Sequence, residues 1–190
     1  MSYITLFISL ALISNVVLSR FLGICPLLGV SKSAKNALSM GAAVTFVVFI
    51  AAVVTYGLYY LVLVPAEITY MDLITFILVI AALVQFVEMF LKKYSPAIYK
   101  AMGVYLPLIT TNCCVLGCAL DNITNEYNFA EACIAGLAVP LGFALVIYIF
   151  ANIRERLAIY NAPKAFQGVP LALITAGIMA CAFAGLGGLV

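Results

Sequence analysis

Two cysteine motifs are the residues of this chain best suited to chemistry. Cys25 begins the run CPLLG and Cys113 begins the run CCVLG, so both fit the pattern C-x-(L/V)-L-G. Each run interrupts an otherwise apolar stretch. A cysteine at the same place in two interrupted membrane segments predicts a two-fold symmetric site in the middle of a bilayer.

A disulfide, a zinc site and an iron–sulfur cluster are three uses of such a pair. A membrane protein with cytosolic exposure gives no strong reason for a disulfide. Zinc and iron–sulfur sites normally need four ligands, of which two symmetric cysteines supply half, and zinc would not explain the membrane depth. A second, similar subunit with another pair is the simpler way to complete the set.

The other cysteines are expected to act as small apolar residues. Cys114 and Cys118 lie four residues apart on one helical face, whereas Cys113 is turned about 100° from Cys114, so one cluster is not expected to use all three. Cys133 and Cys181 have no counterpart in a matching motif. We therefore interpret these four cysteines as filler in apolar packing.

The residues around each motif predict a broken helix. Gly23 loosens the first apolar stretch, and Pro26 lacks an N–H donor but suits the first turn of a new helix. Cys25 would then stand near the start of a half-helix. One helix breaker and three side chains with capping oxygens precede Cys113: Pro107, Thr110, Thr111 and Asn112. The positive ends of both half-helices would favour thiolates and an anionic centre.

The elements that must hold these motifs are membrane helices. Of 190 residues, 67% are hydrophobic and 8% are charged, and there is no His or Trp. Apolar runs of about 20 residues, long enough to cross a bilayer, recur along the chain. We predict an all-α integral membrane protein with one domain over residues 1–190 and no soluble domain. The six expected spans cover residues 3–30, 37–64, 73–91, 97–120, 129–153 and 169–190.

Charged residues predict the orientation of these spans. The nine basic residues fall on the first, third and fifth connections: Arg20, Lys32, Lys35, Lys92, Lys93, Lys100, Arg154, Arg156 and Lys164. The second and fourth connections and their borders carry acids: Glu67, Asp72, Asp121, Glu126 and Glu131. Basic loops stay in the cytoplasm, so both termini are expected on the non-cytoplasmic side of the membrane. Arg20 could lie inside the first span. Without it, eight basic residues still fall on the first, third and fifth connections and none on the second and fourth.

The two halves of the chain also resemble each other outside the cysteine motifs. Gly41 and its neighbours open the second span as Gly136 and its neighbours open the fifth, and the run LIT opens both the third span at Leu73 and the sixth at Leu173. Repeats over about residues 1–95 and 96–190 would each hold three helices. With three crossings in the first repeat, the second repeat starts on the opposite side of the membrane, so the two repeats must be inverted relative to each other. Such an architecture places a site at the midplane between the broken helices 1 and 4.

Glu88 is a second candidate functional residue. It lies inside the third span, three residues after Gln85, and an ionisable side chain in a membrane helix suggests a role in ion movement. The alternative is an ion pair with Lys92 one turn later, near the cytoplasmic end. The sequence favours neither of these two interpretations over the other.

Five segments of the chain resemble a known family. They are FLGICPLLGVS (21–31), QFVEM (85–89), YLPLITTNC (105–113), NIRERL (152–157) and ALITAGIMA (172–180). They closely resemble the A subunit of the bacterial Rnf complex, an ion-translocating ferredoxin:NAD⁺ oxidoreductase, and the homologous E subunit of sodium-pumping NADH:quinone reductase. The resemblance covers essentially the whole chain.

The resemblance implies a membrane electron-transfer subunit of a redox-driven Na⁺ or H⁺ pump. It implies that Cys25 and Cys113 supply half the ligands of a midplane 2Fe-2S cluster, shared with the homologous Rnf E subunit. Further partners would be the Rnf B, C, D and G subunits, with flavins and other iron–sulfur clusters in them, and no nucleic acid. Relatives also carry an acid at the position of Glu88, which makes an ion pathway there reasonable. This chain has no nucleotide fingerprint, so NAD would be bound elsewhere.

Two other classes of protein could share parts of this pattern. A secondary transporter would have the inverted repeat, but polar or charged groups would be expected at its helix breaks, where this chain has thiols. A structural assembly subunit would share the composition but would need no paired cysteines.

Overall fold

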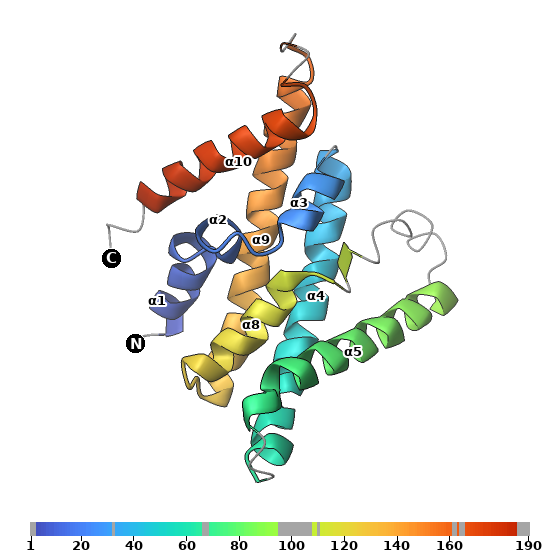
Figure 1. The fold of residues 1–190 in the computed structure, drawn as a ribbon, viewed down its shortest axis with the longest axis vertical. Coiled ribbons are helices and arrows are strands. Elements are labelled where there is room, and N and C mark those ends of the chain that lie inside the picture. The colour runs from blue at the N-terminus through green and yellow to red at the C-terminus, as the bar shows by residue number, and fades with distance from the viewer. Residues whose placement is uncertain are drawn as a thin grey trace.

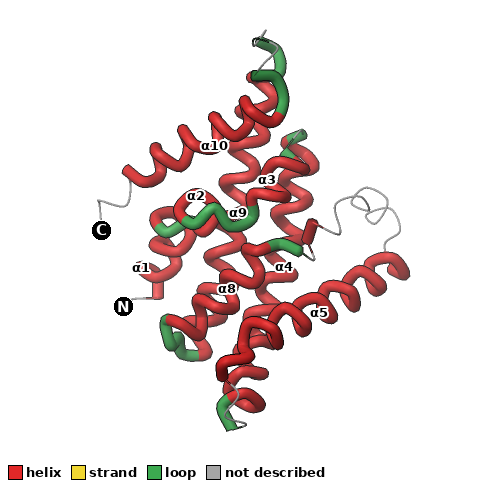
Figure 2. The backbone as a smooth tube through the Cα atoms, viewed as in Figure 1, coloured by secondary structure: helices red, strands yellow, loops and turns green. Residues whose placement is uncertain are grey.

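The structure is a computed structural model that describes residues 3–31, 33–65, 69–94, 108–109, 111–160, 163 and 166–185. Regular elements in these ranges are helices (Figure 2). In chain order they are α1 (Tyr3–Ile8), η1 (Ser9–Ile13), α2 (Val16–Ser19), α3 (Ile24–Val30), α4 (Ala34–Leu58), η2 (Tyr59–Leu63), η3 (Thr69–Met71), α5 (Asp72–Tyr94), α8 (Cys113–Thr124), α9 (Phe129–Leu157) and α10 (Val169–Ala184). The short elements η1 and η2 are π-helices, and η3 is a 3₁₀ turn.

The described helices include three that are long and apolar enough to cross a membrane. These segments are Ala34–Leu63, Asp72–Met89 and Phe129–Leu157. Three shorter apolar helical segments are Tyr3–Ile13, Cys113–Thr124 and Val169–Ala184. The all-helical class predicted from composition is confirmed for the described residues, and these apolar helices are consistent with a membrane protein. The six segments fall within or overlap the six expected spans, and the exact six-span repeat stays a prediction.

The helices α4 and α9 form the centre of the molecule and run antiparallel to each other (Figure 1). A Cβ atom added at Gly41 would stand 2.7 Å from the Cβ of Ala144, and one added at Gly136 would stand 2.9 Å from the Cβ of Ala52. Small residues at these crossings let two backbones approach closely, which is how apolar helices gain contact area where lipid removes the hydrophobic drive to associate. The two broken helices pack on this pair.

The first predicted span is broken twice. The expected break comes between α2 and α3, where Gly23 has φ +88°. An additional break precedes α2 at Asn15, whose side-chain oxygen accepts from the N–H of Val17 at 3.1 Å and whose amide nitrogen donates to the carbonyl of Ala11 at 3.0 Å. A Cβ at Gly142 would overlap that same carbonyl oxygen, so α9 passes directly beside this break.

The fourth predicted span yields one half-helix in the described part of the chain. Helix α8 starts at Cys113 after the N-cap residue Asn112, as predicted, and ends at Thr124. Its 12 residues are about 18 Å long, roughly half a membrane crossing. The predicted helix breaker Pro107 and capping residue Thr110 lie outside the described residues.

The basic residues of α4 and α9 lie at one end of this pair. At one end, the backbone N–H of Ala34 donates to the Glu155 carboxylate at 2.8 Å, which brings Lys35 of α4 close to the basic end of α9. At the opposite end, the rings of Tyr56 and Phe129 lie 5.6 Å apart, where α9 begins. Four charged residues that contribute to the predicted orientation lie outside the described residues: Lys32, Glu67, Lys100 and Lys164.

The position of Arg20 differs from the expectation. The charge pattern assigns it to the first cytoplasmic connection, but it lies at the break between α2 and α3, where its guanidinium forms an ion pair with Asp121 of α8. The same pattern assigns Asp121 to the opposite side of the membrane. A long basic side chain at a helix break can extend toward either face, so Arg20 carries no information on orientation.

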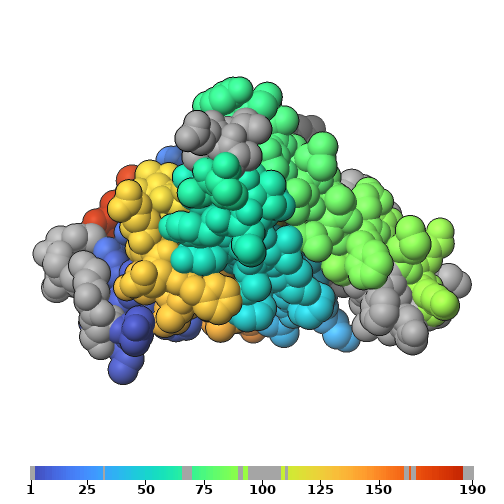
Figure 3. Space-filling model, turned by 90° about the horizontal axis from the view of Figure 1, so that it is seen from below, coloured from blue at the N-terminus to red at the C-terminus, as the bar shows by residue number. Residues whose placement is uncertain are grey.

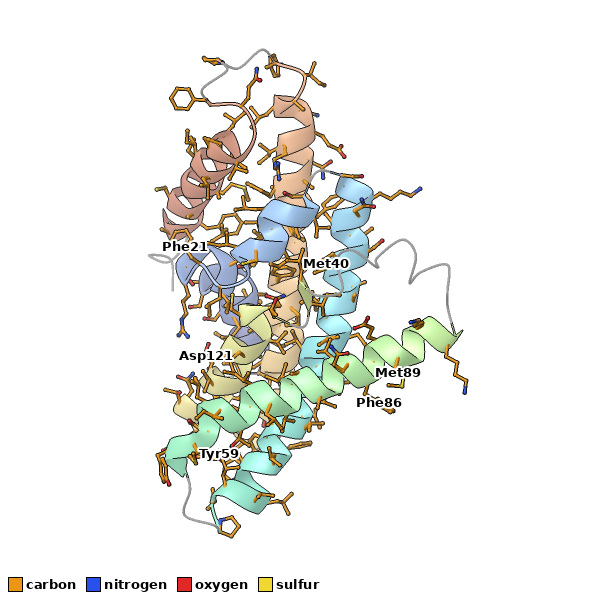
Figure 4. All side chains as sticks on the ribbon, turned by 45° about the vertical axis from the view of Figure 1, so that its right-hand side comes forward. Phe21, Met40, Tyr59, Phe86, Met89 and Asp121 are labelled. Carbon is orange, nitrogen blue, oxygen red and sulfur yellow. The ribbon has the colours of Figure 1, made fainter. Side chains whose placement is uncertain are left out.

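Helix α5 diverges from the rest of the molecule. It packs on α4 and α8 near its start and then extends outward (Figure 1; Figure 3, green). Apolar side chains such as Phe86 and Met89, which are 68% and 70% exposed, lie on its outward surface (Figure 4). These side chains face lipid or another subunit in a membrane.

Candidate functional site

The two predicted cysteines both stand at the start of a half-helix. Cys25 is the second residue of α3, after the left-handed N-cap residue Gly23. Cys113 is the first residue of α8, after Asn112, whose side-chain oxygen accepts from the N–H of Cys114 at 3.1 Å. Glycine tolerates the positive φ that the first start requires, and asparagine is among the best N-cap residues for the second. The local sequence therefore fixes where both helices begin.

The two helix starts touch each other. The backbone N–H of Gly23 donates to the sulfur of Cys113 at 2.9 Å, across 90 residues of sequence. The fully buried ring of Phe143 on α9 packs against Gly23, and its Cε2 would lie 3.0 Å from a Cβ added there. This contact between Gly23 and Cys113 joins the two cysteine motifs, and we call it the junction. Helix α9 packs against the junction through Phe143.

The six cysteines have different surroundings. Cys25 is exposed and Cys113 is half-buried, so both residues reach the surface of the chain. Cys114 and Cys118 are 0% and 1% exposed and belong to the hydrophobic core, as expected of filler. Cys133 is half-buried on α9 and Cys181 is exposed on α10.

Metal chemistry at this junction would need ligands from outside the described residues. Within the part of the chain that the structure describes, no group of three or more His, Cys, Asp or Glu side chains is placed to hold a metal ion. Two neighbouring helix starts that each present one thiol are half of the set that an iron–sulfur cluster uses. The backbone N–H groups at the start of α8 also favour negative charge there.

Two features of this region were not anticipated from the sequence. Asn112 has a buried side-chain nitrogen without a hydrogen-bond partner among the described residues. Arg154 of α9 donates to the carbonyl of Leu28 at 2.9 Å and to the hydroxyl of Ser31 at 2.7 Å. It therefore caps the far end of α3, where a cation is favoured by the helix dipole. The sequence marks Arg154 only as a basic residue near a membrane boundary.

The ion pair of Arg20 and Asp121 lies beside the same junction. The turn between α2 and α3 includes Phe21, which has φ +56° and is 53% exposed. Asp121 lies two turns along α8 from Cys113 (Figure 4). The ion pair of Arg20 and Asp121 therefore links the first broken helix to the second.

The same carboxylate also affects the loop that follows α8. Burial and then the charges of Asp121 and Glu131 raise the pKa of Tyr127 there.

Glu88 lies in the second half of α5, which extends away from the junction of the two cysteine motifs (Figure 1). Its side chain is half-buried, whereas Lys92, one turn later on the same helix, is exposed. The structure therefore does not bring Glu88 together with Cys25 and Cys113. Its role in ion movement and the alternative ion pair with Lys92 both stay predictions.

Comparison with known proteins gives matches over the full length of the chain. A family described as "Rnf-Nqr subunit, membrane protein" matches residues 3–190. The A subunit of the Na⁺-translocating ferredoxin:NAD⁺ oxidoreductase complex of Acetobacterium woodii is 57% identical over 189 residues, covering 100% of this chain and 98% of that protein. The A subunits of the ion-translocating oxidoreductase complexes of Serratia proteamaculans and Aromatoleum aromaticum are 50% and 51% identical, over 99% of this chain and 97% of their own lengths.

Proposed function

This chain belongs to the Rnf-Nqr family of membrane subunits, and from that membership we propose that it is the A subunit of an ion-translocating ferredoxin:NAD⁺ oxidoreductase. Its relatives are named as subunits of such complexes. In this proposal, the role of the chain is to carry electrons within the membrane while the complex moves Na⁺ or H⁺. Nucleotides and flavins would be bound by the other subunits.

The contact between Gly23 and Cys113 is the observation that carries this proposal. The 2.9 Å hydrogen bond places the thiol of one half-helix at the start of the other, two residues before Cys25. Cys25 and Cys113 would hold one edge of a 2Fe-2S cluster, which, when bound, supplies a one-electron carrier inside the membrane. The donors at the start of α8 would stabilise its negative charge, and Phe143 and the core cysteines would keep water away from the junction.

A homologous subunit, the Rnf E subunit, would supply the other two thiolates. Cys25 is exposed in the single chain, so this residue is open to contact with a partner. Cys113 keeps part of its surface open as well. A pseudo-symmetric pair of chains then gives four thiolates with no further ligand from this chain. The Rnf B, C, D and G subunits complete the proposed assembly.

An inverted repeat accounts for the packing of α4 on α9. The sequence match relates Gly41 to Gly136, an offset of 95 residues. The same offset relates Phe49 to Ala144. Gly41 packs on Ala144, and Gly136 packs on Phe49, with 3.8 Å from an added Cβ to the Phe49 Cα. Each contact is therefore the image of the other, as a two-fold axis between α4 and α9 requires.

The decisive experiment is spectroscopy on cysteine variants of the purified complex. We expect Cys25→Ser and Cys113→Ser to remove the membrane 2Fe-2S signal in electron paramagnetic resonance and visible absorption, because a lost thiolate has no substitute in apolar surroundings. Cys181→Ser is the matched control, since Cys181 is also an exposed cysteine on a helix. Cys133→Ser should be equally silent.

Two results would contradict the proposal. If the spectrum is unchanged in both Cys25→Ser and Cys113→Ser, this chain holds no cluster. That result is the one expected of a transporter or of a structural assembly subunit. Loss of the signal in Cys114→Ser with an unchanged Cys113→Ser spectrum would move the ligand by one residue, into the core. The clusters of the other subunits provide an internal reference for protein amount in each sample.

A further inference from the structure

Asn112 carries a buried hydrogen-bond donor that has no partner among the described residues. Its side chain is 4% exposed, and its oxygen accepts from the N–H of Cys114, which leaves the amide nitrogen Nδ2 unsatisfied. An unpaired polar group in an apolar interior costs free energy, and inside a membrane no water is at hand to satisfy it. Such an atom calls for a partner that the described part of the chain does not provide.

The amide is held in one orientation. The N–H of Cys114 needs an acceptor, so the oxygen must face α8 and the nitrogen must face away from it. The oxygen also lies 3.3 Å from the point where a Cβ on Gly23 would stand. Because both amide atoms are bonded to the same carbon, Nδ2 lies next to this oxygen, at the junction of the two cysteine motifs.

A second asparagine in the same chain shows that the capping role does not require an unpaired nitrogen. Asn15 caps α2 as Asn112 caps α8, with its oxygen accepting from a backbone N–H two residues later. Its Nδ2, however, donates to the carbonyl of Ala11 at 3.0 Å. Of these two capping asparagines, the one with the unpaired donor is the one beside the cysteines.

We propose that Nδ2 of Asn112 donates a hydrogen bond to a sulfur of the iron–sulfur group held by Cys25 and Cys113, and so raises its reduction potential. This inference rests on the proposed function. The reduced group is more negative than the oxidised one, so a donor to sulfur stabilises it more strongly. Asn112 would then both start the helix that presents Cys113 and adjust how readily the group accepts an electron.

The test is a redox titration of the complex that carries Asn112→Ser, followed by electron paramagnetic resonance. Serine keeps an N-cap oxygen and removes the amide. We expect full cluster content and a lower midpoint potential, with about a tenfold lower ratio of reduced to oxidised cluster at a fixed potential, or about 59 mV for one electron. Asn15→Ser is the matched control and should leave the potential unchanged.

A second measurement uses the complex with its sequence unchanged, so it does not depend on whether a variant assembles the cluster. Complex grown with asparagine labelled with ¹⁵N in the side-chain amide should show a weak ¹⁵N coupling to the reduced cluster in pulsed paramagnetic resonance. The coupling should persist in Asn15→Ser and vanish in Asn112→Asp, which keeps the capping oxygen and the size but lacks the donor. Absence of the coupling in the unchanged complex overturns the inference, even if Asn112→Ser fails to assemble.

The results also separate this inference from the proposed function. If the unchanged complex has the membrane cluster, and Cys25→Ser loses it, but Asn112→Ser titrates at the unchanged potential, then only the role of Asn112 is wrong. If Cys25→Ser and Cys113→Ser both keep the membrane signal, the proposed function fails and this inference fails with it.

Discussion

At the scale of single residues, the surroundings of a side chain decide its role more than its type does. Cys113 and Cys114 are adjacent, yet the first accepts a hydrogen bond from Gly23 and the second is packed in the core at 0% exposure. A helix turns about 100° per residue, so neighbours on α8 face different surroundings. A thiol enclosed by apolar side chains is inert, whereas one at a helix start is suited to bind as a thiolate.

Glu88 offers a test of ion movement at the same scale. Replacement by Gln keeps the shape of the side chain and removes its charge, so a coupling role predicts weaker ion dependence and slower ion uptake in vesicles that hold the complex. The signal of the proposed membrane cluster should stay intact. Glu126→Gln is the matched control, because Glu126 is exposed in the turn after α8. Normal pumping by Glu88→Gln would contradict a role in the ion pathway and favour the ion pair with Lys92.

At the scale of elements, the α4–α9 crossing sets the tolerance of the molecule to added volume. In Gly41→Ala the new methyl group would stand 2.7 Å from the Ala144 Cβ and 3.1 Å from its Cα. Backbone atoms cannot move aside as a flexible side chain can, so the helices must separate. We expect the free energy of unfolding to fall by about 1–3 kcal/mol.

Unfolding of the detergent-solubilised chain, followed by circular dichroism, measures this effect. Gly57→Ala is the matched control on the same helix, because its nearest neighbour, the Cδ1 of Leu61, is 3.9 Å away. That change should be neutral or stabilising by up to about 1 kcal/mol, since alanine favours a helix. Equal stability of the two variants would contradict tight packing at the crossing.

A helix boundary could be predicted from the sequence where the residues that cause it are adjacent in the chain and of types that break or cap helices. The starts of α3 and α8 were predictable because glycine, proline and capping side chains stand next to the cysteines. The break at Asn15 was missed, since its two partners, Ala11 and Val17, belong to an apolar run that predicts a continuous helix. Long-range contacts such as that of Arg154 with Leu28 depend on packing, which local patterns do not encode.

At the scale of the whole molecule, charge predicts the orientation in the membrane. The α4–α9 pair holds Lys35, Arg154 and Arg156 toward one end and Glu131 at the other. Without Arg20, eight basic residues remain for the cytoplasmic side. We therefore expect both termini outside the cytoplasm.

Reporter fusions test this orientation. Alkaline phosphatase is active only outside the cytoplasm, so a fusion after Val190 should be active and a fusion after Tyr160, in a connection expected inside, should not. A fluorescent reporter that folds only in the cytoplasm should give the reverse pattern. Fluorescence from the fusion at Val190 would contradict the predicted orientation.

The paired contacts of α4 and α9 bear on how the chain can diverge over evolutionary time. If the proposed inverted repeat arose from a dimer of identical three-helix units, one codon change in that ancestor would have altered both crossings at once. In the single chain, Gly41 with Ala144 and Gly136 with Phe49 are encoded separately. Each crossing can therefore drift alone, provided that its own two positions change together. Among relatives, we expect a larger residue at 41 to accompany a smaller one at 144, with no matching change at 136.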